Sequence, residues 1–268
     1  MTEQYIHSAQ NPLIKEYKKL LTGSRQRKKL GKIALEGPNL IEGALNAGLN
    51  PEVVFYTQDY YDSEGKLLID QLSTAARRVV LTEGLFDEIA ETDNPREVAA
   101  ILPFNAEKVQ SRQYDETKLI MILDRLQDPG NMGTIIRTAA AAGIDMIYYT
   151  RGSVDPYSPK VMRSTAGLIF HIPVILLDAP SLKLKNLKQE GLKIVAAYKK
   201  GQNLWQADYG EKTAIIIGNE AGGISEELLE LADLKVAVPI EKPVESLNAA
   251  TAAAVITYEI IRRSRKMP

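Results

Sequence analysis

The stretch that decides the fold is residues 238–248, VPIEKPVESLN, near the C-terminus. A strand-like end at Val238 turns through two prolines into an alanine-rich run. That run predicts a long helix over 246–263, with Ser246 as its N-cap and Asn248 in its first turn. Such a loop exposes backbone amides and small polar groups at a helix N-terminus, where a polar ligand can bind.

Two similar loops lie upstream in the same half of the chain. Residues 128–133, DPGNMG, lead into a helix on which we expect Asn131 at the cap and Arg137 nearly two turns further on. Residues 218–223, GNEAGG, follow an apolar run, and their glycines permit a close approach of the backbone. Three such loops suggest one composite site.

Apolar strands alternate with helical segments from residue 118 onward. The predicted strands are 119–123, 146–149, 174–177, 193–197, 214–217 and 235–238, and the predicted helices are 132–142, 158–166, 181–190, 225–231 and 246–263. Continuously apolar strands separated by helices predict an α/β fold with a mostly parallel sheet covered on both faces. Ligands of such sheets bind at the carboxyl ends of the strands, where all three loops fall.

The first hundred residues predict a smaller α/β unit. Its predicted helices are 11–30, 38–47 and 65–77, and its predicted strands are 33–36, 53–56, 79–81 and 98–102. The polar stretch 105–117 is weakly periodic, which is typical of a boundary. We therefore expect domains at 1–105 and 118–268, joined by a linker at 106–117.

The composition narrows the class of protein. With 45% hydrophobic and 25% charged residues, the chain has the composition of a globular protein. It has no cysteine, and its only histidines are His7 and His171, so we expect no disulfide, no thiolate site and no metal centre. It has no apolar signal core or membrane-spanning stretch, which favours a cytoplasmic protein.

The net charge of −1 hides a basic segment near the N-terminus. Between residues 15 and 32 the single acid is Glu16, and the basic residues are Lys15, Lys18, Lys19, Arg25, Arg27, Lys28, Lys29 and Lys32. Such a segment can bind nucleic-acid phosphates, but a run of charges is more often the solvated face of a helix. The segment alone leaves both interpretations open.

The three loops together resemble the SpoU, or TrmH, branch of the SPOUT superfamily of RNA 2′-O-ribose methyltransferases. The resemblance covers about residues 118–263. It rests on Asn131-Met132-Gly133 with Arg137, on Gly218-Asn219-Glu220, and on Val238-Pro239-Ile240 with Ser246-Leu247-Asn248. Ser8, Asn11-Pro12, the basic helix and Leu35-Glu36-Gly37 are similar to the L30e-like substrate-binding domain that many members carry.

This resemblance implies a trefoil knot in the C-terminal domain, a homodimer, and S-adenosylmethionine as cofactor. The cofactor contacts that it implies are at Gly218, Asn219, Val238, Ile240 and Leu247. The catalytic residues that it implies are Arg137, Asn131, Glu220, Ser246 and Asn248. The substrate would be structured RNA, ribosomal RNA more than tRNA, held in part by Lys15, Arg25, Arg27, Lys28 and Lys29.

Methyl transfer from a sulfonium to a ribose hydroxyl requires in-line alignment and removal of a proton. The loops contain no histidine, and the resemblance assigns the proton to Arg137. A guanidinium is almost always protonated, so Arg137 could instead bind phosphate and stabilise the forming alkoxide. A catalytically silent RNA-binding protein of this fold is the alternative from another class. A nucleotide-binding enzyme predicts a P-loop or dinucleotide fingerprint, and the sequence has neither.

Overall fold

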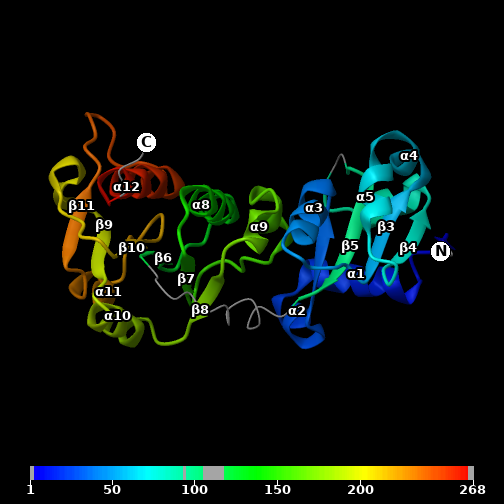
Figure 1. Cartoon of the computed structure of the whole chain (residues 1–268), viewed down its shortest axis with the longest axis horizontal. Helices are drawn as coiled ribbons and strands as arrows, with labels where there is room; N and C mark the ends of the chain where they lie inside the picture. Colours follow the sequence, from blue (N-terminus) through cyan, green and yellow to red (C-terminus); the bar gives the residue numbers. More distant parts are fainter. Residues whose placement is uncertain (1–2, 93–94, 105–117, 265–268) are drawn as a thin grey trace. The chain divides into compact units, whose positions relative to one another are not determined.

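The computed structural model describes residues 3–92, 95–104 and 118–264, which form two compact units (Figure 1). One unit consists of the described residues up to 104 together with Tyr157–His171. The other consists of the described residues from 118 onward outside that segment. The expected linker at 106–117 lies outside the described residues. Each unit has its own sheet.

The N-terminal unit contains a mixed five-stranded sheet in the order β1-β4-β3-β5-β2. Strands β1, β4 and β3 pair in parallel, whereas β5 is antiparallel to both of its neighbours. The strands are β1 (Gln4–Ile6), β2 (Lys32–Glu36), β3 (Val53–Thr57), β4 (Arg77–Leu81) and β5 (Val98–Pro103). The helices are α1 (Pro12–Thr22), α2 (Ser24–Leu30), α3 (Pro38–Asn46), α4 (Gln58–Tyr60), η1 (Tyr61–Gly65), α5 (Lys66–Gln71), α6 (Glu83–Ile89), α9 (Pro159–Ser164) and η2 (Leu168–Phe170).

Helix α1 forms because its apolar residues recur at helical spacing and pack on this sheet. The ring of Tyr17 meets that of Phe55 edge-on, with 5.6 Å between ring centroids. The single helix expected over 11–30 is wrong, because Gly23 has an extended backbone that ends α1 and begins α2. Strand β1 and helix α6 were not among the predicted elements.

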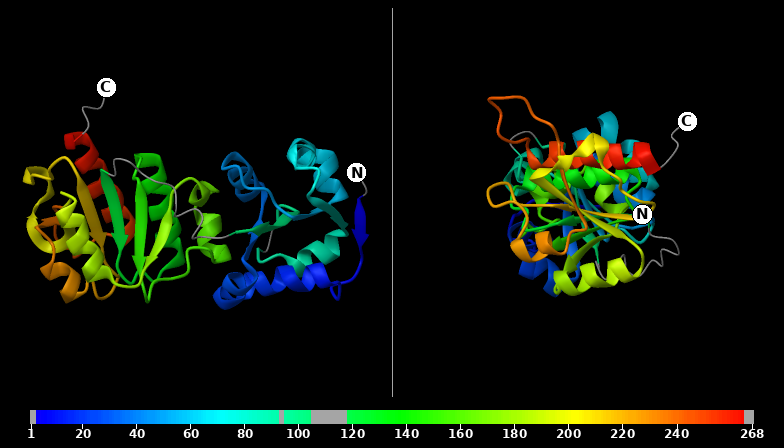
Figure 2. Two further views of the ribbon diagram at one scale, coloured as in Figure 1. Left: turned by 60° about the horizontal axis from the view of Figure 1, so that its bottom comes forward. Right: turned by 90° about the vertical axis from the view of Figure 1, so that its left-hand side faces the viewer.

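The C-terminal unit contains a six-stranded sheet in the order β11-β9-β10-β6-β7-β8, and all five pairings are parallel. This confirms the predicted parallel sheet. The strands are β6 (Leu119–Leu123), β7 (Met146–Thr150), β8 (Val174–Leu177), β9 (Lys193–Asn203), β10 (Thr213–Ile217) and β11 (Leu234–Ala237). The helices are α8 (Pro129–Ala142), α10 (Pro180–Gln189), η3 (Leu204–Gln206), α11 (Glu226–Glu230) and α12 (Ala249–Ser264). Figures 1 and 2 show α8 and α12 on one face of the sheet and α10 and α11 on the other.

The order of the strands reverses between β6 and β10. Strands β7 and β8 lie on one side of β6. The later strands β9, β10 and β11 lie on its other side, with β10 next to β6. The last residues of the two central strands, Leu123 and Ile217, lie side by side in register. The loops that follow them therefore start together at a switch point, where ligands of parallel sheets bind.

Candidate functional site

The N-terminus of α8 is capped by Asp128. Its Oδ1 accepts a hydrogen bond from the backbone N–H of Asn131 over 2.7 Å, and Pro129 occupies the first helical position. The expectation that Asn131 is the cap is therefore wrong. Asn131 is the third residue of the helix and is 7% exposed. Because Asp128 is the cap, the Asn131 side chain is not needed for capping and bonds to the other loops instead.

Asn131 links all three loops through its carboxamide. Its Nδ2 donates to Oε1 of Glu220 over 2.8 Å, and its Oδ1 accepts from Nδ2 of Asn248 over 2.8 Å. The carboxylate only accepts, so it fixes which end of the Asn131 amide faces it. We call Asn248, Asn131 and Glu220 the polar relay. Three of the residues predicted for one composite site therefore lie together in the structure.

Glu220 accepts further hydrogen bonds from the loop that precedes α8. The backbone N–H groups of Gln127 and Asp128 lie 3.4 Å from its carboxylate oxygens. Desolvation raises the pKa of Glu220, but the hydrogen bonds from Asn131 and from backbone amides outweigh it and hold the pKa below its usual value. An ionised carboxylate of this kind orients donors and is a weak base.

Asn248, rather than Ser246, caps helix α12. Its Oδ1 accepts from the backbone N–H groups of Ala250 over 2.9 Å and Thr251 over 3.3 Å. The helix begins at Ala249, so Ser246 is exposed in the preceding loop and its predicted capping role is wrong. A carboxamide can cap the helix with its oxygen and bond to Asn131 with its nitrogen at once, which a serine hydroxyl in this loop does not do.

The 218–223 loop is held closed by its own backbone and by Asn219. Gly218 passes so close to Gly223 that a Cβ would lie 2.3 Å from the Gly223 carbonyl carbon. Asn219 accepts at Oδ1 from the N–H groups of Ala221 and Gly222, each over 2.9 Å, and donates to the Arg125 carbonyl over 2.8 Å. The Asn219 side chain therefore shapes the loop, and the Gly218 backbone is left as the candidate for a cofactor contact.

Asp124 is a site residue that the sequence analysis did not single out. It is 2% exposed, its Oδ1 accepts from the Thr150 hydroxyl over 3.0 Å, and its Oδ2 accepts from the Ser225 N–H over 2.7 Å. It therefore ties together the ends of β6 and β7 and the start of α11. The available signal was a carboxylate directly after the apolar run of β6.

Arg137 lies outside the polar relay. It is exposed on α8 and makes no hydrogen bond or ion pair with the part of the chain that the structure describes. It lies six positions after Asn131 on the helix, so the two side chains point about 120° apart. Within one chain the structure does not bring this predicted residue to the other three.

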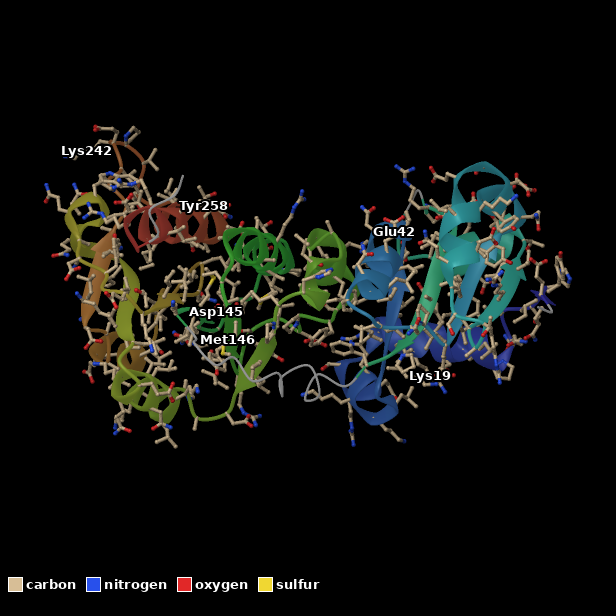
Figure 3. The ribbon with its side chains drawn as sticks, viewed as in Figure 1. Lys19, Glu42, Asp145, Met146, Lys242 and Tyr258 are labelled. Carbon is tan, nitrogen blue, oxygen red and sulfur yellow. The ribbon has the colours of Figure 1, made fainter. Side chains whose placement is uncertain are left out.

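The loop that joins β11 to α12 carries the remaining predicted cofactor residues. Val238 and Leu247 are half-buried, whereas Ile240 is 38% and Val244 is 55% exposed. Lys242 marks this loop in Figure 3, where it projects from the body of the unit. The exposed apolar side chains of Ile240 and Val244 leave surface in this loop that a bound ligand could cover.

The basic segment of the N-terminal unit divides into two kinds of residue. Arg27 is buried, and its Nη1 donates to the carbonyls of Leu20 over 2.6 Å and Leu21 over 3.3 Å, the last turn of α1. Arg27 thus joins α2 to α1 inside the fold, and its expected contact with RNA stays a prediction. The exposed cations of the segment are Lys15, Lys19, Arg25, Lys28 and Lys29, and Figure 3 labels Lys19.

Two other basic residues of the segment are already paired. Lys18 lies 2.8 Å from Glu88, and Lys32 lies 2.8 Å from Glu16 and 2.6 Å from Glu52.

Among the described residues, no helix is long and apolar enough to cross a membrane, and no three His, Asp or Glu side chains gather as metal ligands.

Comparison with known families matches both units. Residues 118–258 match the SpoU rRNA Methylase family, and residues 11–100 match the MRM3-like substrate binding domain. The chain is 35% identical over 257 residues to the 23S rRNA (guanosine(2553)-2′-O)-methyltransferase RlmP of Bacillus subtilis, covering 95% of this chain and 98% of the relative. It is 30% identical to human mitochondrial rRNA methyltransferase 3, over 89% of this chain and 69% of that protein.

Solved structures are similar to this chain over almost its whole length. The SpoU methyltransferase AviRb of Streptomyces viridochromogenes, in complex with its cofactor AdoMet, superposes with a TM-score of 0.85 at 26% identity, covering 95% of this chain and 98% of that one. The AdoMet-bound rRNA methyltransferase of Sinorhizobium meliloti gives a TM-score of 0.84 at 26% identity, over 97% of this chain and 98% of that one.

Proposed function

The chain belongs to the SpoU rRNA methylase family, and we propose that it is an S-adenosylmethionine-dependent methyltransferase acting on the ribose 2′-hydroxyl of ribosomal RNA. The observation that carries this proposal is the polar relay at the switch point between β6 and β10. Through it the three loops of the family resemblance meet in one place. The predicted fold, enzyme class and cofactor agree with the family match.

Ribosomal RNA is favoured over tRNA by how much of the chain each relative covers. The 23S rRNA relative matches 95% of the chain, including the N-terminal unit. The tRNA (guanosine(18)-2′-O)-methyltransferase of Aquifex aeolicus matches only 59% at 31% identity. A substrate-binding unit shared with the rRNA enzymes supports a 23S-type substrate.

The cofactor fits the loops at the carboxyl ends of β10 and β11. We assign its contacts to the backbone of Gly218, Val238, Ile240 and Leu247, with Asn219 holding the 218–223 loop in shape. S-adenosylmethionine supplies an electrophilic methyl group when it is bound there. The protein contributes alignment, because the relay fixes these loops relative to one another before the RNA arrives.

The proposed catalytic residues divide by what each can do. Glu220 and Asn248 hydrogen-bond to Asn131 and would orient it, and we assign the exposed Ser246 hydroxyl to the ribose. Arg137 has a free guanidinium, which suits a clamp on phosphate and on the forming alkoxide better than a role as proton acceptor. Its distance from the relay along α8 supports a site completed by a second copy of the chain, so the homodimer stays part of the proposal.

The N-terminal unit would hold RNA through the exposed cations Lys15, Arg25, Lys28 and Lys29. Their side chains are exposed, and they form no ion pair with another described residue. Arg27 supports them indirectly by joining α2 to the end of α1. The cytoplasmic location expected from the sequence stays a prediction.

The test is methylation of 23S rRNA by the purified protein with radiolabelled S-adenosylmethionine, followed by mapping of the 2′-O-methyl site. The same site should lose its methyl group in cells that lack the gene. Transfer to tRNA but not to rRNA would overturn the choice of substrate. Failure to methylate either RNA, by a protein that binds the cofactor, would favour the catalytically silent alternative.

A further inference from the structure

A cleft of about 670 Å³ lies within the N-terminal unit, and no role proposed so far uses it. It lies between the outer face of α3, which presents Asn39, Glu42 and Asn46, and η1 with α5, which present Glu64, Leu67 and Gln71. Its volume is that of a typical small-ligand site. Figure 3 labels Glu42 on α3.

Close backbone contacts build the walls of this cleft. A Cβ on Gly43 would lie 2.7 Å from the backbone of Gly167, so α3 and the segment after α9 approach at two glycines. That contact places Arg163 and Ala166 at the cleft. On the other side, Gly65 has no Cβ to collide with the Tyr60 ring, which would otherwise be 2.2 Å away.

The charged groups of the cleft are not equally available. Both oxygens of Glu36 are occupied, by the Glu91 N–H over 2.8 Å and the Thr92 hydroxyl over 2.6 Å. Glu64 forms an exposed ion pair with Arg96 at 3.6 Å. Glu42 is different, because its exposed carboxylate makes no hydrogen bond or ion pair with any residue that the structure describes.

The neutral groups complete the site. The Tyr60 hydroxyl is protonated at neutral pH and can donate; burial and the nearby carboxylates of Glu64 and Glu42 raise its pKa further, to about 12. Exposed amides of Asn46 and Gln71 can both donate and accept. Leu67 is 72% exposed and offers an apolar surface against which a planar ring can stack.

We propose that this cleft binds an unstacked guanine of the RNA substrate, with the Glu42 carboxylate accepting from the Watson–Crick edge. Sequence-specific proteins read RNA mainly through bases that are splayed out of the helix. Guanine presents two adjacent donors on that edge, N1–H and N2–H, which match the two oxygens of a carboxylate. Adenine, cytosine and uracil place an acceptor beside each donor, which a carboxylate repels.

The rim of the cleft suits the backbone of the same nucleotide. The exposed Arg96–Glu64 ion pair contributes little stability, so Arg96 can exchange Glu64 for a phosphate at small cost. Arg163, which also lines the cleft, forms an ion pair with Glu91 at 3.4 Å. The proposal rests on the RNA substrate proposed above and adds to it a recognised base.

In the experiment, the protein is titrated separately with GMP, AMP, CMP, UMP and inorganic phosphate, and binding is measured by NMR or calorimetry. GMP should bind about tenfold more tightly than the other nucleotides, and Glu42→Gln should remove about that factor, since hydrogen bonds to a charged group are the stronger kind. Asp87→Asn, which removes an exposed charge on α6 outside the cleft, should leave GMP binding unchanged. Glu42→Gln should also weaken binding to 23S rRNA and not to S-adenosylmethionine.

Three results would overturn this inference: no binding of GMP, equal binding of all four nucleotides and phosphate, or GMP binding that Glu42→Gln does not weaken. Methylation of 23S rRNA by the parent protein is measured alongside. If methylation occurs without a guanine site, only this inference fails. If GMP binds at Glu42 but no RNA is methylated, the proposed function fails instead.

Discussion

Asn131 donates to Glu220 over 2.8 Å although 89 residues separate them in sequence. The bond joins the loop after β6 to the loop after β10, the two strands at the centre of the parallel sheet. Because Asn131 also accepts from Asn248, one carboxamide sets the positions of all three loops. The geometry of the site therefore depends on an amide that need not touch the reacting atoms.

Replacing Asn131 with aspartate should show this dependence. Asn131→Asp places a second carboxylate against Glu220, so the two groups repel where the parent pair attracts. We expect methyl transfer to fall by about a hundredfold, since small misplacements of a site cost about that factor. Adding Glu220→Gln restores an uncharged partner and should recover part of the rate. A double variant no faster than Asn131→Asp would contradict the coupling.

Arg137→Ala tests a residue that the structure leaves outside the relay. We expect near-normal affinity for S-adenosylmethionine in calorimetry and methyl transfer slower by about a hundredfold or more, the scale of one lost electrostatic donor. Arg137→Lys separates the two roles, because lysine can lose its proton but cannot form the planar fork. Rescue by lysine at high pH would favour the base, and an alanine variant with the parent rate would remove Arg137 from the mechanism.

The apolar runs of the C-terminal half were enough to predict its six strands and the loops at their ends. The pairing of Asn131 with Glu220 could not be predicted, because it depends on β6 lying beside β10, a contact between distant segments. Asp128 and Asn131 are both good cap formers three residues apart, and only the backbone path chooses between them. The trefoil knot stays a prediction of the resemblance.

The N-terminal half was harder to predict for a local reason. Arg25 and Arg27 lie two residues apart in one basic run, yet the first is exposed and the second is buried. The helix is interrupted at Gly23, so α2 turns different residues toward the core than a continuous helix would. Helical spacing counted along residues 11–30 as one helix therefore does not predict which cations are buried. Composition identified the basic segment but could not say which of its cations face solvent.

The pH dependence of the free energy of unfolding should show how much the ionised Glu220 carboxylate stabilises the fold. Its pKa is lower in the folded protein than usual, so its stabilising contribution is present above the ordinary glutamate pKa of about 4.3 and is lost as the pH falls through the folded value. Glu220→Gln does not titrate there. The difference in free energy of unfolding between parent and Glu220→Gln should therefore shrink on acidification, as measured by urea denaturation. A constant difference across that range would contradict the assignment.

Charge reversal on α2 should weaken RNA binding without harming the fold. Changing Arg25, Lys28 and Lys29 to glutamate removes exposed cations, so fewer counterions are released on binding. We expect lower affinity for 23S rRNA fragments and a flatter dependence of affinity on salt concentration. The melting temperature should stay close to that of the parent. If the affinity for RNA and its salt dependence were unchanged, these residues would be a solvated helix face that does not contact RNA.

Arg27→Met should instead lower the stability of the fold and leave the salt dependence of RNA binding unchanged. Methionine keeps an unbranched apolar stem but cannot donate to the carbonyls of Leu20 and Leu21, which lie in the last turn of α1. Losing hydrogen bonds from a charged group should lower the free energy of unfolding by about 1–3 kcal/mol. The matched control, Arg25→Met on the exposed face, should change it by less than about 0.5 kcal/mol. If Arg27→Met were as stable as the parent yet bound RNA with a flatter salt dependence, Arg27 would be a phosphate contact after all.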